Sequence, residues 1–575
     1  MSRQWINVLC VSVWGVIALW ITFSFMVAVS SGLYHGPFKD MWWMMPLVED
    51  VYSGHARFQD FMAVHGGAHR LAIPRILYLL DFIFFSGSNR FLVVVSLLAQ
   101  CVAFVVWFLQ IRALKLARIR KLFLWGLVLL VCFSGIQIEN VLYTFDCQWF
   151  LANTFSLLAL VYLVKDLTLP SVVHNRLLVF FFGICASFCS FLGVCVLVLA
   201  AVISLYARRQ DGHVWLQTCF ILVFVIWYVS GFESNAFAVF DGMPVSTPFV
   251  AAGVFTLRLL QWTLIYIGSP LTRDVQWLGM LMAACAIAYV LVQCVRFLRN
   301  PRDAFTAPEL FFLFVALFAL AVVVATGLGR MYFIHTADED RYQTINMTFW
   351  LGTWLLLLTP LCHQPWYKQR LVGVLVVLWA GYVGLYWHSR DILARLREFE
   401  LVRASVVAQA VGVTDYLAIR DTLILGDKAR QINRGMMHRH FLQERALGAY
   451  ATDVAQHYGQ AIMPALKSGS CQIIPSEMQM LSSGHWRFRI KLDGVVADRV
   501  WVVDPENIIR GSMVPVQWEY ANAMHVFTLA PPIVEWLGYA NLETLEIGSV
   551  KVLVFRDGQL QCEAEISLNQ RAVLM

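Results

Sequence analysis

The chain has 575 residues, of which 59% are hydrophobic and only 14% are charged. Soluble globular domains are about 45–50% apolar, so this composition excludes an ordinary soluble protein and indicates an integral membrane protein. The formal net charge of +6 is modest, and the sequence has no basic tail, low-complexity tract or internal repeat. Solenoid folds are therefore excluded, and no nucleic-acid partner is predicted.

The first apolar run covers residues 6–29 and follows a single basic residue, Arg3. This run is longer than the about 7–15 residues of a signal-peptide core, and no small-residue cleavage site follows it. The sequence therefore predicts an uncleaved signal anchor that crosses the membrane over residues 6–30, with the amino terminus in the cytoplasm.

A first external loop is expected over residues 31–89. Its stretch 36–70 is rich in ionisable side chains for so apolar a chain: Asp40, Glu49, Asp50, Asp60, His65, His69 and Arg70. The apolar segment 71–86 contains a proline and two charged residues, Arg75 and Asp81. We therefore predict a helix that lies in the membrane interface over 71–86, rather than a further span.

Apolar length and the position of basic residues predict the remaining spans. The strongest cytoplasmic marker is RALKLARIRK, residues 112–121. The expected spans are 90–111, 122–137, 147–164, two short helices within 177–206, 214–231, 275–297, 309–327, 344–361 and 371–387. Residues 250–268 then lie along the membrane; in the alternative, 177–206 crosses once and 250–268 is a span. Both give about eleven spans and place everything after residue 388 outside.

The composition changes after residue 388. Residues 389–469 show helical apolar spacing, and 470–575 form short β-rich runs with turn signals at Asp493-Gly494 and Asp557-Gly558. The predicted fold class is a polytopic α-helical membrane protein with a C-terminal periplasmic α+β domain that ends in a β-sandwich-like sheet. We expect a transmembrane domain (1–388), a helical periplasmic connector (389–469) and a β-rich domain (470–575).

The thirteen cysteines lie mostly in apolar runs, where they behave as small hydrophobic residues, and no CxxC pair occurs. Only Cys471 and Cys562 lie well beyond the last expected span. If this region is periplasmic, the sequence allows a disulfide between these two cysteines but does not decide whether it forms.

Two further stretches on the expected external face contain ionisable groups. Residues 137–150 include Glu139 and Asp146, and residues 327–346 include a larger set: Arg330, His335, Asp338, Asp340 and Arg341. Charges at the membrane boundary are costly unless they are paired, hydrated or used, so their gathering on one face predicts a functional site.

The residue types indicate the chemistry of this site. A carboxylate can take a proton from an acceptor hydroxyl, and an arginine can bind two phosphate oxygens at once. A lipid carrier would present its phosphate at this level, and no nucleotide-binding glycine motif is found in the sequence. The combination points to sugar transfer from a polyprenyl-phosphate carrier.

On these residues the sequence resembles the GT-C superfamily of integral membrane glycosyltransferases. The motifs are an early acidic residue in the first external loop (K-Asp40-M-W-W), a downstream acidic pair (Glu49-Asp50), H-G-G-A-His69-Arg70, and a late external GxGR…DRY stretch that ends in Arg341-Tyr342. Within the superfamily the layout is most similar to bacterial enzymes that glycosylate type IV pilin or modify O-antigen, including the pilin arabinosyltransferases.

The resemblance implies a role for each matching residue. Asp40 is expected to be the catalytic base, with Glu49 or Asp50 as the second acidic group. The expected ligands of the donor phosphate are Arg70, Arg330 and Arg341, and the further site candidates are His65, His69 and Tyr342. The family usually has two adjacent acidic residues at the first position. Here the first of the two is replaced by Lys39, and only Asp40 is acidic.

No metal site is predicted. His65 and His69 are four residues apart, but Gly66 and Gly67 between them disfavour a helix, and the HExxH pattern is absent. The cofactor is left open, because some relatives hold a divalent cation with external acidic residues, a role that Asp40 with Glu49 or Asp50 could take.

The predicted function is that of a bacterial inner-membrane glycosyltransferase. It would transfer a sugar from a polyprenyl-phosphate donor to a periplasmic acceptor, either a pilin protein or lipopolysaccharide and its O-antigen. The alternative is a transporter or flippase of lipid-linked glycans, although such proteins usually carry polar residues and broken helices near the midplane. A third alternative is a polymerase of the O-antigen type. The sugar, the acceptor and the stereochemical outcome are left open by the sequence.

Overall fold

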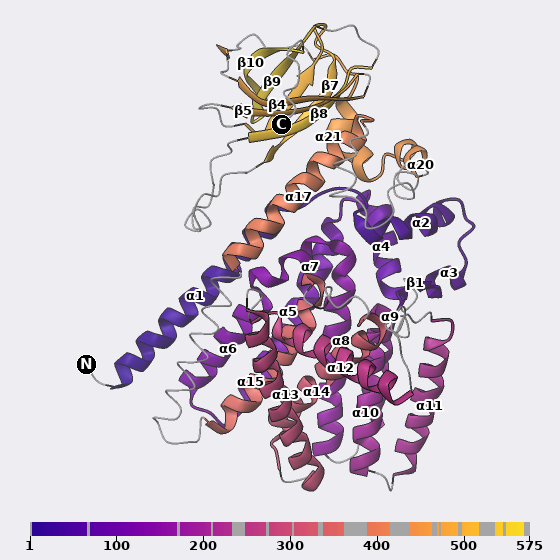
Figure 1. Cartoon of the computed structure of the whole chain (residues 1–575), viewed down its shortest axis with the longest axis vertical. Coiled ribbons are helices and arrows are strands. Elements are labelled where there is room, and N and C mark those ends of the chain that lie inside the picture. The colour runs from indigo at the N-terminus through magenta and orange to yellow at the C-terminus, as the bar shows by residue number, and fades with distance from the viewer. Residues whose placement is uncertain are drawn as a thin grey trace. The chain divides into compact units, whose positions relative to one another are not determined.

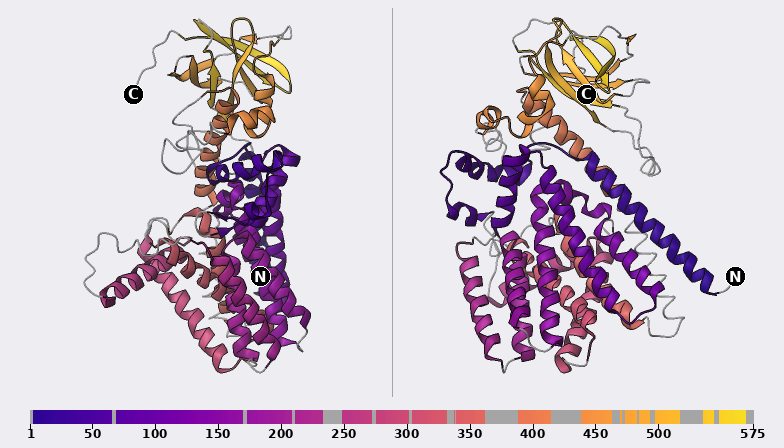
Figure 2. Two further views of the ribbon diagram at one scale, coloured as in Figure 1. Left: turned by 90° about the vertical axis from the view of Figure 1, so that its right-hand side faces the viewer. Right: turned by 180° about the vertical axis from the view of Figure 1, so that it is seen from behind.

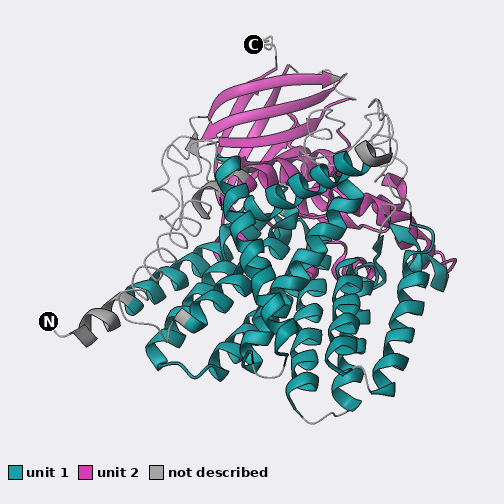
Figure 3. Cartoon of the chain, turned by 60° about the horizontal axis from the view of Figure 1, so that its bottom comes forward, with its two compact units in different colours: residues 1–26, 57–76, 93–388 teal, residues 27–56, 77–92, 389–575 magenta. Residues whose placement is uncertain are grey.

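The structure is a computed structural model of the chain (Figure 1). It describes residues 3–65, 69–169, 173–208, 211–232, 248–271, 275–301, 304–331, 337, 339–361, 388–413, 438–462, 469–470, 473–482, 484–492, 497–516, 535–543 and 548–568. The chain divides into two compact units (Figure 3). Unit 1 comprises residues 1–26, 57–76 and 93–388, and unit 2 comprises residues 27–56, 77–92 and 389–575.

Unit 1 is a helical membrane domain (Figures 1 and 2). Its longer helices are α6 (Arg118–Cys132), α8 (Cys147–Thr168), α9 (Val173–Cys189), α10 (Leu192–Arg208), α11 (Gly212–Val229), α12 (Pro248–Gly268), α13 (Gln276–Arg299), α14 (Ala307–Arg330) and α15 (Gln343–Leu361). Its short elements are α3 (Phe58–Met62), β1 (Val64–His65), β2 (His69–Arg70), η2 (Gly135–Gln137), α7 (Ile138–Leu142), η3 (Thr144–Asp146) and η6 (Asp340–Tyr342). The boundaries between the units fall inside α1 (Arg3–Ser31), α4 (Ala72–Phe85) and α5 (Arg90–Ala113), and α17 (His388–Ala410) belongs to unit 2 from its second residue on.

The helical membrane fold is confirmed. Among the described residues, 7 helices are long and apolar enough to cross a membrane, and each predicted span that falls on these residues coincides with a helix to within a few residues. Residues 177–206 form two helices, α9 and α10, as predicted, and 71–86 contain α4. The expected span 371–387 lies outside the described residues, and the number and direction of the crossings remain predictions.

The local sequence explains how two of these helices begin. A Cβ atom at Gly193 would lie 1.9 Å from the backbone nitrogen of Ser187, so glycine is required where α10 turns back against α9. Helix α14 starts with a capping box. The Thr306 side chain accepts the backbone N–H of Glu309, and the Glu309 carboxylate accepts the backbone N–H of Thr306. Pro308 fits this first turn because its missing N–H would have no partner there.

Large aromatic side chains pack the interior of unit 1. The Trp107 ring on α5 lies 5.3 Å from the Phe311 ring and 6.1 Å from the Phe312 ring of α14, measured between centroids. All three side chains are buried. Aromatic pairs of this kind contribute about 0.5–1.5 kcal/mol beyond the area that they bury, so they fix α5 against α14.

The β-rich part of unit 2 forms one eight-stranded sheet in the order β3-β10-β9-β6-β7-β8-β5-β4, drawn in magenta in Figure 3. The strands are β3 (Gly469–Ser470), β4 (Ile473–Ser482), β5 (His485–Leu492), β6 (Arg499–Val503), β7 (Ile509–Val516), β8 (Glu535–Asn541), β9 (Ser549–Arg556) and β10 (Gln559–Ser567). Asp557 and Gly558 connect β9 to β10 with φ of 52° and 74°, which confirms that predicted hairpin. Asp493 and Gly494 lie outside the described residues.

Alternation along the strands buries both faces of this sheet. Phe488, Ile490 and Leu492 of β5 belong to a core on one face, together with alternate residues of β6, β7, β9 and β10. On the other face, Leu537 and Tyr539 of β8 pack on the apolar side of α17 (His388–Ala410). The predicted C-terminal α+β domain is therefore confirmed.

Segments of the loop that follows α1 fold together with this tail inside unit 2. The loop elements are η1 (Lys39–Met44) and α2 (Met45–Tyr52), and the remaining tail helices are α20 (Arg439–Glu444), η9 (Gly448–Ala451) and α21 (Asp453–His457). The Gly36 N–H donates to Gly87 O at 2.9 Å, and the Gly448 N–H donates to Ser86 O at 2.8 Å. A Cβ atom on Gly448, which has φ of +56°, would lie 3.0 Å from Gly36 Cα, so the close backbone approach requires small residues.

Arg75 and Asp81, the two charges on α4, have separate partners. Arg75 lies in unit 1 and donates to the carbonyls of Phe61 and Ala63 at 2.8 and 2.6 Å. Asp81 lies in unit 2 and accepts the Asn89 N–H at 3.0 Å. Each therefore anchors α4 to the chain around it.

Candidate functional site

Four of the sequence-predicted residues gather in unit 1. We call Arg330, Arg341, Tyr342, His69 and Tyr266 of α12 the arginine–tyrosine cluster; Tyr266 is its one member that the sequence did not single out. Arg330 ends α14, Arg341 and Tyr342 form the turn η6 before α15, and His69 lies on β2. Asp146, at the end of η3, acts electrostatically on Arg341 and Tyr342. The structure thus brings together polar residues from five separate chain segments.

Aromatic rings surround the Tyr342 side chain, which is 1% exposed. Its ring centroid lies 4.9 Å from Tyr266, 5.8 Å from Trp149 and 6.4 Å from Trp262. These partners come from α12 and from the first turn of α8, and all are buried. The rings therefore fix the position of η6, and with it the backbone that carries Arg341.

Four polar atoms on these rings are buried without a hydrogen bond. Within the part of the chain that the structure describes, no partner is found for Tyr266 OH, Tyr342 OH, Trp149 Nε1 or Trp262 Nε1. A buried donor without a partner costs about 1–3 kcal/mol, and native proteins leave few of them. A group of such donors beside two guanidinium groups forms an environment suited to an anion.

The charges around the cluster set its protonation states. Burial lowers the pKa of His69 to about 3, with Arg330, His65 and Arg341 adding to the effect, so the His69 imidazole is neutral at pH 7. Burial acts to lower the pKa of Arg341, but Tyr342, Glu339 and Asp146 together raise it above its ordinary value. Burial raises the pKa of Tyr342. The cluster is therefore cationic at its arginines, with neutral donors around them.

Hydrogen bonds from α7 and η2 hold the turn that carries Arg341. The Asn140 Nδ2 amide donates to Thr344 Oγ1 at 2.9 Å and to the Arg341 carbonyl at 3.4 Å. The Thr344 hydroxyl in turn donates to Gln137 Oε1 at 2.9 Å. The Arg341 guanidinium contacts Glu339. Contacts to the Arg341 carbonyl and to its guanidinium thus both hold Arg341 in its observed orientation.

Arg70 has a different environment from Arg330 and Arg341. Its guanidinium donates to three backbone carbonyls, those of Tyr228, Met62 and Ser230, at 2.9, 2.7 and 2.6 Å. The guanidinium carbon also lies 5.1 Å from the centroid of the Trp227 ring. In this structure Arg70 joins the loop to the end of α11, and its role toward a phosphate stays a prediction.

His65 and His69 face each other across a two-stranded antiparallel pair, so they do not share a helix face. His65 packs against Phe145 at 5.2 Å between ring centroids. No group of three or more potential metal-ligating side chains is found among the described residues. His65 therefore lies next to His69, at the border of the cluster.

The three acidic candidates lie in unit 2. Asp40 is in the first turn of η1, and Glu49 and Asp50 are on α2. Glu49 Oε1 lies 2.7 Å from Nδ1 of His438, while the Asp50 carbonyl accepts the N–H groups of His55 and Ala56 at 2.8 and 3.1 Å. His335 and Asp338 lie outside the described residues, and nothing is described of the side chain of Asp340.

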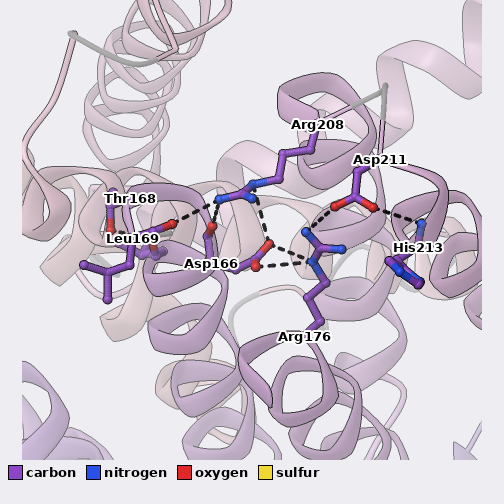
Figure 4. A network of polar contacts seen from close by, with 8 residues as sticks. Asp166, Thr168, Leu169, Arg176, Arg208, Asp211 and His213 are labelled. Atoms are coloured by element: carbon purple, nitrogen blue, oxygen red, sulfur yellow. Dashed lines mark hydrogen bonds and ion pairs between the residues drawn. The ribbon is translucent and has the colours of Figure 1, made fainter. Parts of the chain in front are cut away.

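A second charged network in unit 1 joins the ends of four helices (Figure 4). We call Asp166, Arg176, Arg208 and Asp211 the helix-end network. Arg176 donates to Asp166 at 3.3 Å and to Asp211 at 2.6 Å, and Arg208 contacts the carboxylate and carbonyl of Asp166. Asp211 also caps α11 by accepting the His213 N–H at 3.0 Å. Each carboxylate here has an arginine partner.

Sequence reasoning missed several of these residues. Tyr266, Trp149 and Trp262 lie in apolar runs, where an aromatic residue carries no sign of its partners. The carboxylates Asp166 and Asp211 were detectable, since each lies near the basic residues that mark a helix end.

Comparisons with known proteins complete the description. No protein-family model matches the sequence, and no curated protein matches it. A search of solved structures finds a crystal structure of ArnT from Cupriavidus metallidurans bound to undecaprenyl phosphate. The sequence identity is 14%, the match covers 82% of this chain and 84% of that one, and the TM-score is 0.36. The function is therefore argued below from the residues of this chain.

Proposed function

We propose that the protein is an inner-membrane glycosyltransferase of the GT-C type. It takes a sugar from a polyprenyl-phosphate donor and transfers it to a periplasmic acceptor, a pilin protein or lipopolysaccharide with its O-antigen. The observation that carries the proposal is the arginine–tyrosine cluster with the two indoles packed on it, where buried phenol and indole donors without partners in the described chain accompany two arginines.

A lipid-linked phosphate fits this chemistry better than a free metabolite does. Arginine binds phosphate oxygens through paired N–H groups, and neutral O–H and N–H donors can satisfy the remaining oxygens. The cluster follows the ends of apolar helices, α14 and α12, which is where a lipid headgroup would be presented. Hydrophobic helix surface would accommodate the polyprenyl chain.

In the proposed reaction the acceptor hydroxyl oxygen bonds to the anomeric carbon as the bond from that carbon to the phosphate oxygen breaks. Asp40 takes the hydroxyl proton as general base, with Glu49 or Asp50 as the second acidic group. The electron pair of the broken bond stays on the polyprenyl phosphate, and Arg330 and Arg341 stabilise the resulting charge. Arg70 would join them only after exchanging its present carbonyl partners.

The orientation is part of the proposal. Cys562 is disulfide-bonded, and Cys471 lies outside the described residues. Disulfides persist in oxidising compartments such as the bacterial periplasm, which supports a periplasmic tail. The cytoplasmic amino terminus follows from the positive-inside rule applied to the basic segment 112–121.

The test compares Arg341→Gln with a matched control, Arg299→Gln, on the exposed last turn of α13. Binding of undecaprenyl phosphate to the purified full chain would be measured by native mass spectrometry. We expect about a hundredfold loss of affinity for Arg341→Gln, as for a charge-assisted contact to phosphate, and no change for the control. Equal affinity in both variants would contradict the phosphate role.

The transferase activity needs its own measurement. Mass analysis of pilin and lipopolysaccharide from cells with the wild-type gene, without it, and with Asp40→Asn would identify the acceptor. If the Asp40→Asn protein is folded and membrane-inserted and still gives full modification, Asp40 is not the general base. Intact lipid-phosphate binding with unchanged glycans in all strains would instead indicate transport of the lipid-linked glycan.

A further inference from the structure

The backbone just before Asp40 adopts an uncommon conformation. Lys39, which begins η1, has φ of +48°, in the left-handed region that side chains other than glycine rarely adopt. Such conformations cost free energy, persist only where surrounding contacts impose them, and cluster at functional sites. The contacts that impose this one are therefore informative.

An ion pair holds the Lys39 side chain to the tail. Lys39 Nζ lies 2.9 Å from Glu398 Oε1 of α17, and the two side chains are only 17% and 21% exposed. Arg395, one turn earlier on α17, contacts the same carboxylate. Burial acts to raise the pKa of Glu398, but Lys39 and Arg395 outweigh it and lower the pKa below its ordinary value. Glu398 is thus a charged anchor for the turn.

The neighbouring residue on α17 holds the other side of the same turn. The Phe399 ring lies 5.6 Å from Tyr34 and 5.8 Å from Phe38, between centroids, and Tyr34 and Phe38 contact each other at 5.6 Å. All three side chains are at most 2% exposed. Two adjacent residues of α17 therefore fix Phe38 and Lys39, which directly precede Asp40.

We infer that Glu398 and Phe399 are positioning residues for Asp40. By holding the left-handed turn at Lys39, α17 sets the direction in which η1 starts and hence where the Asp40 carboxylate is presented. Helix α17 also packs on the tail sheet through Ala404, Val407 and Ala408. The tail thereby orients the proposed catalytic base. This inference rests on the proposed function of Asp40.

The first experiment measures the turn itself and needs no substrate. Hydrogen–deuterium exchange of the full chain in lipid nanodiscs would be compared for wild type, Glu398→Gln and the control Glu477→Gln. Glu477 forms a similar pair with Arg487, at 2.7 Å, within the sheet. We expect the amides of residues 40–45 to exchange about tenfold faster in Glu398→Gln, the size expected for loss of a charge-assisted contact, and to be unchanged in the control. Unchanged exchange in Glu398→Gln would overturn the inference.

The second experiment asks whether Glu398 acts through Asp40. The fraction of modified acceptor in cells would be compared for Glu398→Gln, Asp40→Asn and the double variant. We expect Glu398→Gln to lower the wild-type level about tenfold and to have no further effect in the Asp40→Asn background, since interacting residues are not additive. The charge-reversed pair Lys39→Glu with Glu398→Lys should recover part of the loss.

The outcomes separate the two ideas. Full modification by Asp40→Asn contradicts the role of Asp40 as base, whatever Glu398→Gln does, and with it the positioning role that depends on Asp40. Loss of modification in Asp40→Asn, with both exchange and modification normal in Glu398→Gln, leaves the function standing and overturns the positioning role. A loss in Glu398→Gln that adds fully to that of Asp40→Asn would overturn it as well.

Discussion

The arginine–tyrosine cluster and the helix-end network both place two arginines among buried groups of unit 1, yet they differ in how their polar atoms are satisfied. In the helix-end network each carboxylate has an arginine partner, and Asp211 additionally caps a helix. In the cluster, buried phenol and indole donors have no partner among the described residues. The comparison indicates that the network stabilises the fold, and it supports the proposal that the cluster binds an anionic ligand.

The largest effect is expected from a variant that breaks the helix-end network. Arg176→Gln leaves the Asp166 carboxylate, 2% exposed, with only the longer 3.8 Å contact to Arg208. Removal of one partner from a buried pair costs about 3–5 kcal/mol, and the contact to Arg208 places the expectation at the lower end. The midpoint of unfolding in detergent checks it, with Arg118→Gln on the exposed start of α6 as control. Affinity of the folded fraction for undecaprenyl phosphate should not change; a loss there with normal stability would reverse the two roles.

The second variant changes a cluster residue and tests whether its hydroxyl serves ligand binding and not stability. Tyr342→Phe removes a hydroxyl that has no partner in the described structure and keeps the ring packing. We expect unchanged stability and about tenfold weaker binding of undecaprenyl phosphate, the value of one hydrogen bond to a charged group.

Tyr289→Phe is the matched opposite of that variant, because the Tyr289 hydroxyl donates to Leu356 O at 3.3 Å. It should lower stability by about 1 kcal/mol and leave binding as in wild type. If Tyr342→Phe instead destabilises the protein and binds normally, its hydroxyl has an internal partner and the cluster resembles the network.

The smallest effect is a pH dependence. The imidazole of His69 has a pKa of about 3 in the folded chain against an ordinary 6.5, so between these values the unfolded chain binds a proton that the folded chain lacks. Stability is therefore full above pH 6.5 and falls as the pH drops through this interval, by about 1 kcal/mol between pH 6.5 and 5.5.

The measurement for His69 is the midpoint of unfolding across that pH range. His69→Gln should flatten the dependence, whereas His440→Gln, whose side chain is 83% exposed, should keep it. If the unfolding midpoint of His69→Gln changes with pH as steeply as that of wild type, other groups cause the pH dependence.

Much of the cluster was predictable because charges are rare in this chain. Asp146, Arg330 and Arg341 stand out next to apolar spans, and ionisable groups there are costly unless they are used. His69 and Tyr342 were found through the motifs that contain them. Tyr266, Trp149 and Trp262 were missed because an aromatic residue in an apolar run has the same local pattern whether it packs in the core or borders a site.

The partners of Arg70, Glu49 and Lys39 were not predictable from the sequence for a different reason. Each partner is distant along the chain: Tyr228 for Arg70, His438 for Glu49 and Glu398 for Lys39. No local pattern encodes such a pairing, because it depends on how all of the chain between the two partners folds. The assignment of loop segments 27–56 and 77–92 to the tail unit depends on the same kind of contact.

The sequence by itself determined the membrane class, the helical segments, the β-rich tail and the gathering of charges at span ends. These depend on composition and on local periodicity, which hydrophobic burial translates directly into helices and strands. Only the tertiary structure decided which polar groups are satisfied, and so which arginines have carboxylate partners that stabilise the fold and which lie beside buried donors without partners among the described residues. That distinction depends on distances between residues far apart in sequence, since a hydrogen bond is made or missed within a few tenths of an ångström.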